Sequence, residues 1–231
     1  RAGTFSLYLG LIISALFAVG IAVFMEPVLG LLGAGENTFQ YARQYATCVI
    51  VIGGIPTVLS NVLANLIRSI GRSREASAGI IMGGLLNIAL DPLFMFVLMP
   101  DGYEVLGAGL ATCLSNCVAF LFFVIVLARM GRDSVITFSL KGGMPKRESI
   151  GAIFGVGVPS AITTFLFDMD YVILDKLMVG HGDLALAAVG IVLKVERFPL
   201  NVGVGICQGM MPLVAYNYAA KNKRRMEDTI H

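Results

Sequence analysis

The sequence predicts an all-α, polytopic membrane helix bundle with six transmembrane helices, and three observations predict it. The 231 residues are 57% hydrophobic and only 14% charged, with a mean hydropathy of +0.82, whereas soluble domains carry about 25% charged residues. The apolar residues gather in windows of about 20 residues or more, the length that crosses a hydrocarbon layer of about 30 Å. The basic residues gather in alternate loops, as they do on the cytoplasmic side of membrane proteins.

Six windows are expected to form the transmembrane helices. In chain order they cover residues 2–25, 44–67, 76–99, 105–128, 149–178 and 183–220. The first, second and fourth windows contain no charged side chain, the third contains only Asp91, and the last two contain several. Helix is the expected state because a backbone in lipid must satisfy its own hydrogen bonds. The chain begins at Arg1, directly before the first window and without Met, so we expect a fragment and no signal peptide.

The loops orient the helices. Thirteen of the seventeen basic residues precede the first window or follow the second, fourth and sixth. They are Arg1, Arg68, Arg72, Arg74, Arg129, Arg132, Lys141, Lys146, Arg147, Lys221, Lys223, Arg224 and Arg225. The opposite loops, around Glu36 and residues 100–104 and 180–183, are short and acidic or neutral apart from Arg43. Both ends are therefore expected on the cytoplasmic side of a bacterial-type cytoplasmic (inner) membrane.

One long connection, residues 131–148, separates two groups of helices. It contains Gly142, Gly143 and Pro145, which interrupt helices, and it is basic throughout. We expect residues 1–130 to form four transmembrane helices, residues 131–148 a cytoplasmic linker, and residues 149–231 two further helices.

The bulk properties exclude several classes of function. The net charge of +2 comes largely from cytoplasmic loops, so it reports topology and predicts no nucleic-acid partner. The four cysteines lie in apolar windows, where a thiol packs as a small hydrophobe. No enzyme or cofactor motif is recognisable. We therefore predict a protein that is not an enzyme, holds no cofactor and is surrounded by membrane lipid.

Asp91 is the first candidate functional residue, because an ionisable side chain in the middle of a membrane span is usually functional. Asn87 lies one helical turn earlier on the same face. If the third and fourth windows form a hairpin around Asp101 and Gly102, Thr112 lies opposite Asp91. Pro92 adds to the cluster, because proline leaves the backbone carbonyl four residues earlier without its helical donor. These oxygens suit a proton or a hard cation such as sodium; a hydrogen-bonded helix-packing cluster is the alternative.

A second set of charged residues lies in the last two windows. The members expected to face a wet cavity or to pair inside the bundle are Asp168, Asp170, Lys194, Glu196 and Arg197. A hairpin centred on His181 places Asp168 at the depth of Lys194, so these two side chains are expected to form an intramembrane pair. This second set is a candidate for substrate binding or for coupling.

Several blocks of the sequence resemble the multidrug and toxic compound extrusion (MATE) family of secondary transporters. In chain order they are Glu26-Pro27-Val28-Leu29-Gly30-Leu31-Leu32-Gly33-Ala34, Arg68-Ser69-Ile70-Gly71-Arg72, Asn87-Ile88-Ala89-Leu90-Asp91-Pro92-Leu93-Phe94, Gly107-Ala108-Gly109-Leu110-Ala111-Thr112, Gly157-Val158-Pro159-Ser160 and Pro212-Leu213-Val214-Ala215-Tyr216-Asn217-Tyr218-Ala219-Ala220-Lys221-Asn222. Each block is loose by itself, but together and in family order they extend over almost the whole chain.

The resemblance implies a two-lobe, twelve-helix transporter, of which this chain would supply helices three to eight. It also implies export of organic, often cationic, compounds by alternating access, driven by sodium or proton entry. The family's cation site in its first lobe corresponds to Asn87, Asp91 and Thr112. The remaining helices of the full-length chain, one, two and nine to twelve, would complete the protein, and the first of them would contribute an acidic residue to that site.

One departure from the family pattern concerns the fifth window. Some members carry Glu eight residues after the proline of the Gly157–Ser160 block, whereas Phe167 stands there in this chain and Asp168 follows. A shift of one residue turns the side chain by about 100° around the helix, so the role of Asp168 stays open. A flippase for lipid-linked saccharides, whose phosphate would need basic residues such as Lys194 and Arg197, is an alternative function, and an intramembrane enzyme is a more distant one.

Overall fold

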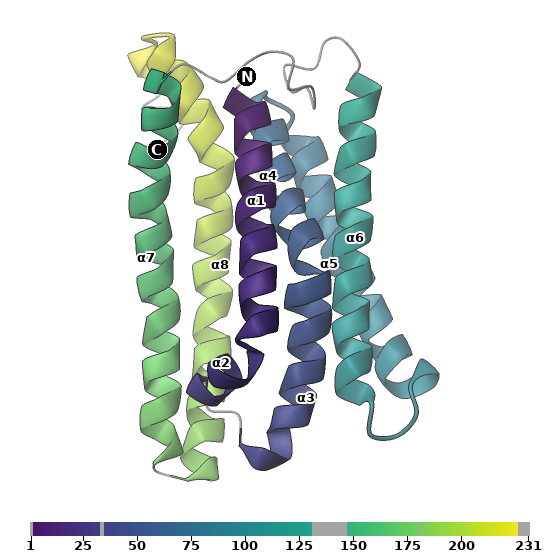
Figure 1. The fold of residues 1–231 in the computed structure, drawn as a ribbon. Helices are drawn as coiled ribbons and strands as arrows, with labels where there is room; N and C mark the ends of the chain where they lie inside the picture. The colour runs from purple at the N-terminus through teal and green to yellow at the C-terminus, as the bar shows by residue number, and fades with distance from the viewer. Residues whose placement is uncertain (1, 33–34, 131–146, 181, 226–231) are drawn as a thin grey trace. The chain divides into compact units, whose positions relative to one another are not determined.

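The computed structural model describes residues 2–32, 35–130, 147–180 and 182–225, and these residues are helical wherever they have regular structure (Figure 1). The chain divides into two compact units, Arg1–Ile150 and Gly151–His231. The first unit contains α1 (Ala2–Val23), α2 (Met25–Leu31), α3 (Glu36–Ala46), the π-helix η1 (Thr47–Ile52), α4 (Gly54–Ser69), α5 (Ser73–Leu93), the π-helix η2 (Phe94–Leu98), α6 (Glu104–Met130) and the first turn of α7 (Arg147–Val179). The second contains the rest of α7 and α8 (Asp183–Ala219).

The all-α membrane architecture expected from hydropathy is confirmed by the length and composition of the helices. Among the described residues, five helices are long and apolar enough to cross a membrane, and a sixth span results if one bent pair is counted together. Many of their large side chains face outward, including Leu16, Ile88 and Phe96, which are 68%, 70% and 74% exposed. Such faces suit a lipid environment or further transmembrane helices.

The second predicted span, residues 44–67, is broken. Residues Thr38–Ile52 and Gly54–Ser69 meet at an angle of 47°, and η1 lies directly before the break. Gly53 and Gly54 weaken helix continuity, and Pro56 cannot donate the backbone hydrogen bond that would continue the preceding turn. These three residues explain why one apolar window becomes two helical segments.

The third predicted span runs from Ser73 to Leu98 but changes its helix type on the way. Pro92 lies inside α5, and η2 begins two residues later. Proline removes one hydrogen bond from the α-helical pattern. Within one turn after Pro92, the backbone changes to the π-helical pattern, in which each N–H bonds to the carbonyl five residues earlier. The polar residues Asn87 and Asp91 lie directly before this irregular turn.

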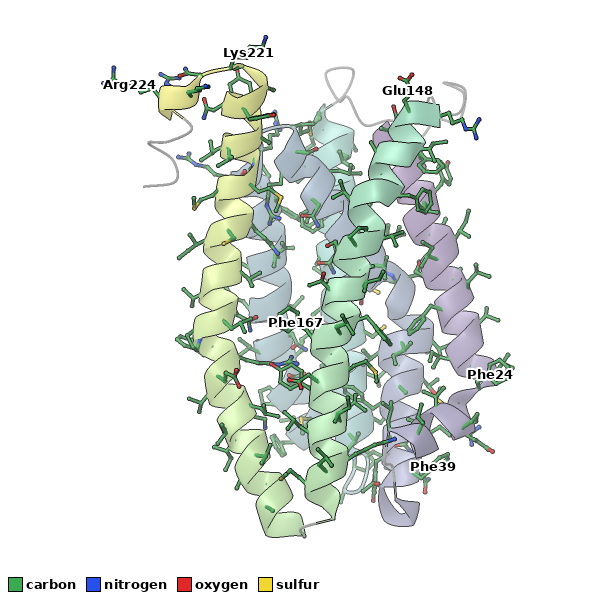
Figure 2. The ribbon with its side chains drawn as sticks, turned by 90° about the vertical axis from the view of Figure 1, so that its left-hand side faces the viewer. Phe24, Phe39, Glu148, Phe167, Lys221 and Arg224 are labelled. Atoms are coloured by element: carbon green, nitrogen blue, oxygen red, sulfur yellow. The ribbon has the colours of Figure 1, made fainter. Side chains whose placement is uncertain are left out.

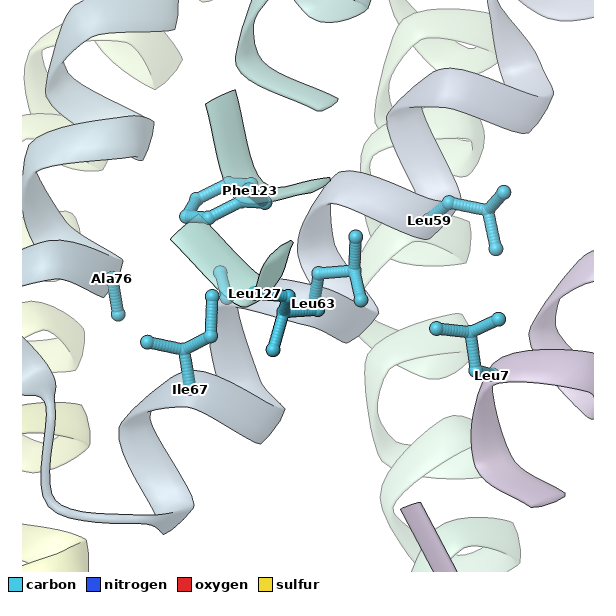
Figure 3. Close-up of a cluster of buried hydrophobic side chains, with 8 residues drawn as sticks. Leu7, Leu59, Leu63, Ile67, Ala76, Phe123 and Leu127 are labelled. Carbon is cyan, nitrogen blue, oxygen red and sulfur yellow. The ribbon is translucent and has the colours of Figure 1, made fainter. Parts of the chain in front are cut away.

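The core of the first unit lies between α1, α4, α5 and α6. Its fully buried centre contains Leu63 and Ile67 of α4 and Phe123 of α6 (Figure 3). A Cβ atom on Gly79 of α5 would overlap the Phe123 ring. Glycine at this position therefore leaves room for the ring to pack against the α5 backbone. This close packing holds α5 against α6 and fixes their relative register.

In the second unit, α7 and α8 are long membrane helices. They contain 33 and 37 residues, which at 1.5 Å per residue corresponds to about 50 and 55 Å. Both exceed the hydrocarbon layer of about 30 Å, so their ends extend into the interfacial regions. Phe167 lies about midway along α7 (Figure 2).

Only part of the predicted linker, residues 131–148, belongs to the residues that the structure describes. Residues 131–146 of the predicted linker lie outside them. Arg147 and Glu148, which the sequence assigned to the end of the linker, form the first two residues of α7. The assignment of residues 131–148 to the cytoplasm remains a prediction.

Arg72 and Asp101, which flank the span Ser73–Leu98, offer a direct test of orientation. We expect a cysteine at position 72 to be protected from a membrane-impermeant thiol reagent in intact cells, and a cysteine at position 101 to react. The physical reason is retention of basic loops in the cytoplasm. Labelling would be done in the full-length protein after removal of the native cysteines, and the reverse pattern would contradict the predicted topology. Lys146 and His181, predicted inside and outside, lie beyond the described residues.

Candidate functional site

Asn87, Asp91 and Thr112 come together in the first unit. The side-chain nitrogen of Asn87 donates to Asp91 Oδ1 at 3.1 Å and to Thr112 Oγ1 at 3.3 Å. The Thr112 hydroxyl donates in turn to the backbone carbonyl of Ala108 at 2.9 Å. All three side chains are half-buried. Thr112 was expected opposite Asp91; in the structure its hydroxyl meets Asn87, one turn earlier on α5, and Asn87 joins it to Asp91.

The two helices bring these side chains together for simple geometric reasons. Asn87 and Asp91 lie four residues apart on α5, which places them on one face. α6 approaches that face closely, because a Cβ on its Gly107 would lie 2.8 Å from the backbone oxygen of Phe94. Thr112 follows Gly107 by slightly more than one turn, so it reaches the level of Asn87. Small residues at the contact thus set the distance between the two polar faces.

The arrangement leaves oxygen atoms available for a cation. Within the described residues, Asp91 receives a hydrogen bond at Oδ1 only, and the side-chain oxygen of Asn87 has no donor. A carboxylate with one unpaired oxygen, an amide oxygen and a hydroxyl oxygen are hard ligands that suit a proton or sodium. The described residues contain no group of three or more His, Cys, Asp or Glu side chains able to hold a metal ion, so this candidate depends on the oxygen donors of mixed type.

A second polar contact, which was not predicted from the sequence, continues from this cluster. Asn116 lies one turn beyond Thr112 on α6, and its side-chain nitrogen donates to Thr57 Oγ1 of α4 at 2.8 Å. The Thr57 hydroxyl donates to the backbone carbonyl of Gly53 at 2.7 Å. The polar line thus runs from α5 across α6 to the break before α4. The spacing of Asn116 four residues after Thr112 was the available signal.

The second candidate set is only partly assembled. Asp168 and Arg197 line one cavity of about 470 Å³ between α7 and α8, and the Arg197 guanidinium lies 4.1 Å from the centre of the Tyr171 ring. The predicted partner of Asp168 is not found: no ion pair between Asp168 and Lys194 occurs among the described residues, where the one salt bridge joins Arg72 to Glu75. All five members are exposed, and Asp170, Lys194 and Glu196 do not line this cavity.

Known proteins resemble this chain over nearly its whole length. A family model described as MatE matches residues 1–93 and 159–231, a region that includes Asn87 and Asp91 but not Thr112. The multidrug export protein MepA of Staphylococcus saprophyticus is 33% identical over 229 residues, which are 98% of this chain and 49% of that protein. The chain therefore spans about half the length of the curated relatives it matches.

Solved structures share the fold. A multidrug resistance MATE family transporter of the MOP superfamily in an inward-facing conformation has a TM-score of 0.76 and 26% identity, covering 98% of this chain and 51% of that chain. An outward-facing structure of a MATE family transporter gives a TM-score of 0.82 at 24% identity, covering 99% and 50%. The relative is named as a multidrug export protein and the two solved structures as multidrug resistance transporters, not as enzymes.

Proposed function

Because the chain belongs to the MatE family, we propose that it works within a cation-coupled antiporter that exports organic, cationic compounds by alternating access. The observation that carries the proposal is the cluster of Asn87, Asp91 and Thr112 in a membrane span. The relative MepA is named as a multidrug export protein, which favours export of small organic molecules over transfer of a lipid-linked saccharide. The coupling ion is sodium or a proton.

The cluster supplies what ion coupling requires. An ionised Asp91 binds a cation while the site faces the outside, and Asn87 and Thr112 orient its carboxylate. When the site faces the cytoplasm, the cation leaves and an empty carboxylate remains. A ligand shifts a conformational equilibrium only through its different affinity for the two states, and a carboxylate in a poorly solvated span gives a large difference. Entry of the ion thereby drives the exit of the compound.

The second unit provides the candidate groups for the exported compound. We assign substrate binding or coupling to the charged positions of α7 and α8, which are Asp168, Asp170, Lys194, Glu196 and Arg197. Asp168 and Arg197 have the better support, because both line the cavity between the two helices. Asp168 would attract the positive charge of an organic cation.

Asn87→Ala and Thr112→Ala should each weaken the apparent affinity for the coupling ion about 3- to 10-fold, because each loses a hydrogen bond or ligand worth about 1 kcal/mol. The full-length protein would be reconstituted in liposomes, and efflux would be measured while sodium is varied at constant pH and pH at constant sodium. Thr47→Ala is the control, since the Thr47 hydroxyl donates to the backbone carbonyl of Arg43 in the preceding turn and, among the described residues, makes no other hydrogen bond. Unchanged ion dependence in both variants would contradict the site.

A further inference from the structure

The residues that follow α8 form a basic segment directly beside a membrane span. The span runs over Ala187–Ala219. Residues 220–225 then contain four basic side chains, which are Lys221, Lys223, Arg224 and Arg225. Basic clusters next to the end of a transmembrane helix attract anionic lipid headgroups.

The backbone turns sharply at Lys221. Its φ of 55° lies in the left-handed region, and in the described part of the chain no other residue except glycine has a positive φ. The backbone amide of Asn222 donates to the Asn217 carbonyl at 2.9 Å, and that of Lys221 donates to the Tyr218 carbonyl at 3.0 Å, a pattern that closes the C-terminus of a helix. Glycine adopts this conformation without strain, so backbone stability alone does not account for a lysine here.

A cavity of about 450 Å³ lies at this turn. It is lined by Asn217, Tyr218 and Ala219 from the end of α8 and by Lys221 and Lys223 beyond it. The volume lies within the range of about 300–1,000 Å³ that small-molecule sites occupy. Tyr218 and Ala219 contribute apolar surface and the two lysines contribute positive charge, so the cavity suits an anionic group attached to an apolar body.

The positive charge at the cavity is not neutralised within the described residues. Lys221, Lys223 and Arg224 are exposed, and in that part of the chain none of the three forms an ion pair. Glu227 and Asp228 follow in the sequence but lie outside the described residues. Lys221 and Arg224 lie beyond the last turn of α8 (Figure 2), where an anion from the surroundings can reach them.

Two tyrosines mark the level of the cavity in the membrane. Tyr216 and Tyr218 are each 74% exposed, and tyrosine is enriched where the hydrocarbon layer meets the headgroups. The apolar span ends at Ala219, between the tyrosines and the lysines. The phosphates of lipid headgroups are therefore the anions nearest to this cavity.

We propose that the cavity at the end of α8 binds the headgroup of an anionic phospholipid. The ammonium groups of Lys221 and Lys223 contact the phosphate oxygens in charge-assisted hydrogen bonds, while Tyr218 and Ala219 contact the glycerol and the first part of an acyl chain. The site lies outside the cation cluster of α5 and α6, and lipid binding requires no transport. It is therefore independent of the coupling mechanism proposed above.

Short-chain lipids test the charge requirement. The full-length protein in an uncharged detergent would be titrated with dioctanoyl-phosphatidylglycerol or with zwitterionic dioctanoyl-phosphatidylcholine, and native mass spectrometry would give the Kd of the first bound lipid. We expect the anionic lipid to bind about 25-fold more tightly, which corresponds to about 5-fold for each of the two lysines. Equal affinity for the two lipids would overturn the proposal.

Substitutions assign the preference to the two lysines. Lys221→Gln and Lys223→Gln should each weaken phosphatidylglycerol binding about 5-fold and leave phosphatidylcholine binding unchanged. Lys221→Gly should weaken it equally while its Tm stays at or above that of the wild type, because glycine tolerates the left-handed backbone. Lower lipid affinity in that variant cannot come from misfolding. Unchanged phosphatidylglycerol binding in all three variants would overturn the assignment.

The matched control is Arg147→Gln. Arg147 is an exposed basic residue at the start of α7, and it does not line the cavity. This variant removes the same charge as Lys221→Gln and should keep the affinity of the wild type. An equal loss of affinity in both variants would show a general effect of surface charge and would refute a specific site.

Soluble anions distinguish a lipid site from a phosphate site. Inorganic phosphate and glycerol phosphate carry the charge without acyl chains, so neither should displace phosphatidylglycerol at equal concentration. Displacement by either one would assign the cavity to a soluble anion and contradict the lipid assignment. A protein without ion-driven efflux whose lipid preference still depends on Lys221 would refute the coupling proposal and support this site.

Discussion

Asp91→Asn is expected to abolish ion-driven efflux by the full-length protein while leaving its membrane insertion and folding largely intact. Asparagine keeps the shape of the side chain and an oxygen that can accept the bond from Asn87, but it removes the charge. Only an ionised carboxylate gives a cation a large advantage over an empty site in a poorly solvated span. The measurement is efflux from proteoliposomes under an imposed sodium or proton gradient.

The matched control for this substitution is Asp101→Asn. Asp101 is an exposed carboxylate in the turn between η2 and α6. The substitution therefore removes the same charge outside the span, and the variant should keep normal coupling. Wild-type rates and ion dependence in Asp91→Asn would show that Asp91 only packs between helices. The ion site would then have to be sought around Asp168 and Asp170.

Gly107→Ala is expected to have the largest effect on stability. The added methyl group would lie 2.8 Å from the Phe94 oxygen and 2.9 Å from its carbonyl carbon, and backbone atoms cannot move aside as a flexible side chain can. Overpacking of this kind costs about 1–3 kcal/mol. We expect a lower Tm of the purified full-length protein, together with weaker ion affinity, because α6 must move away from η2 and carries Thr112 with it.

Gly84→Ala is the control for the glycine substitution. Gly84 lies on α5, and in the described part of the chain a Cβ built there would meet no atom of another helix within 4 Å. Alanine favours helix over glycine by up to about 1 kcal/mol, so this variant should be as stable as the wild type or more so. An unchanged Tm for Gly107→Ala would show that α6 and η2 can separate without cost.

The candidate ion site could be anticipated from sequence because its geometry is regular. Two helices joined by a short turn keep equal depth on both sides, so counting outward from the turn at Asp101 and Gly102 brings Thr112 to the level of Asp91, and Asn87 follows on the same face one turn away. The bend at Gly53 could not be anticipated in the same way, since a hydropathy window averages over 20 residues and reports only that the segment is apolar. The contact of Asn116 with Thr57, whose hydroxyl donates to the Gly53 carbonyl at that bend, was not predicted either.

The expected pair of Asp168 and Lys194 failed because depth alone does not fix where a side chain points. Side chains on a helix lean toward its N-terminus. In an antiparallel pair, Arg197 therefore leans toward the turn and Tyr171 away from it, and they meet although their backbones stand at different depths. The long, flexible Lys194 side chain is exposed, and among the described residues it makes no cation–π contact like that of Arg197 with Tyr171.

The close contact of η2 with α6 and the break before α4 differ in how much movement they allow. Where Gly107 of α6 meets the Phe94 backbone of η2, an added methyl group would lie 2.8 Å from a backbone oxygen, so the two segments have little room to slide or tilt against each other. Gly53 marks a joint at which Thr38–Ile52 and Gly54–Ser69 already meet at 47°. We therefore expect a change in shape within this unit to occur at the bend, where the hydrogen bond between Asn116 and Thr57 links α4 to α6.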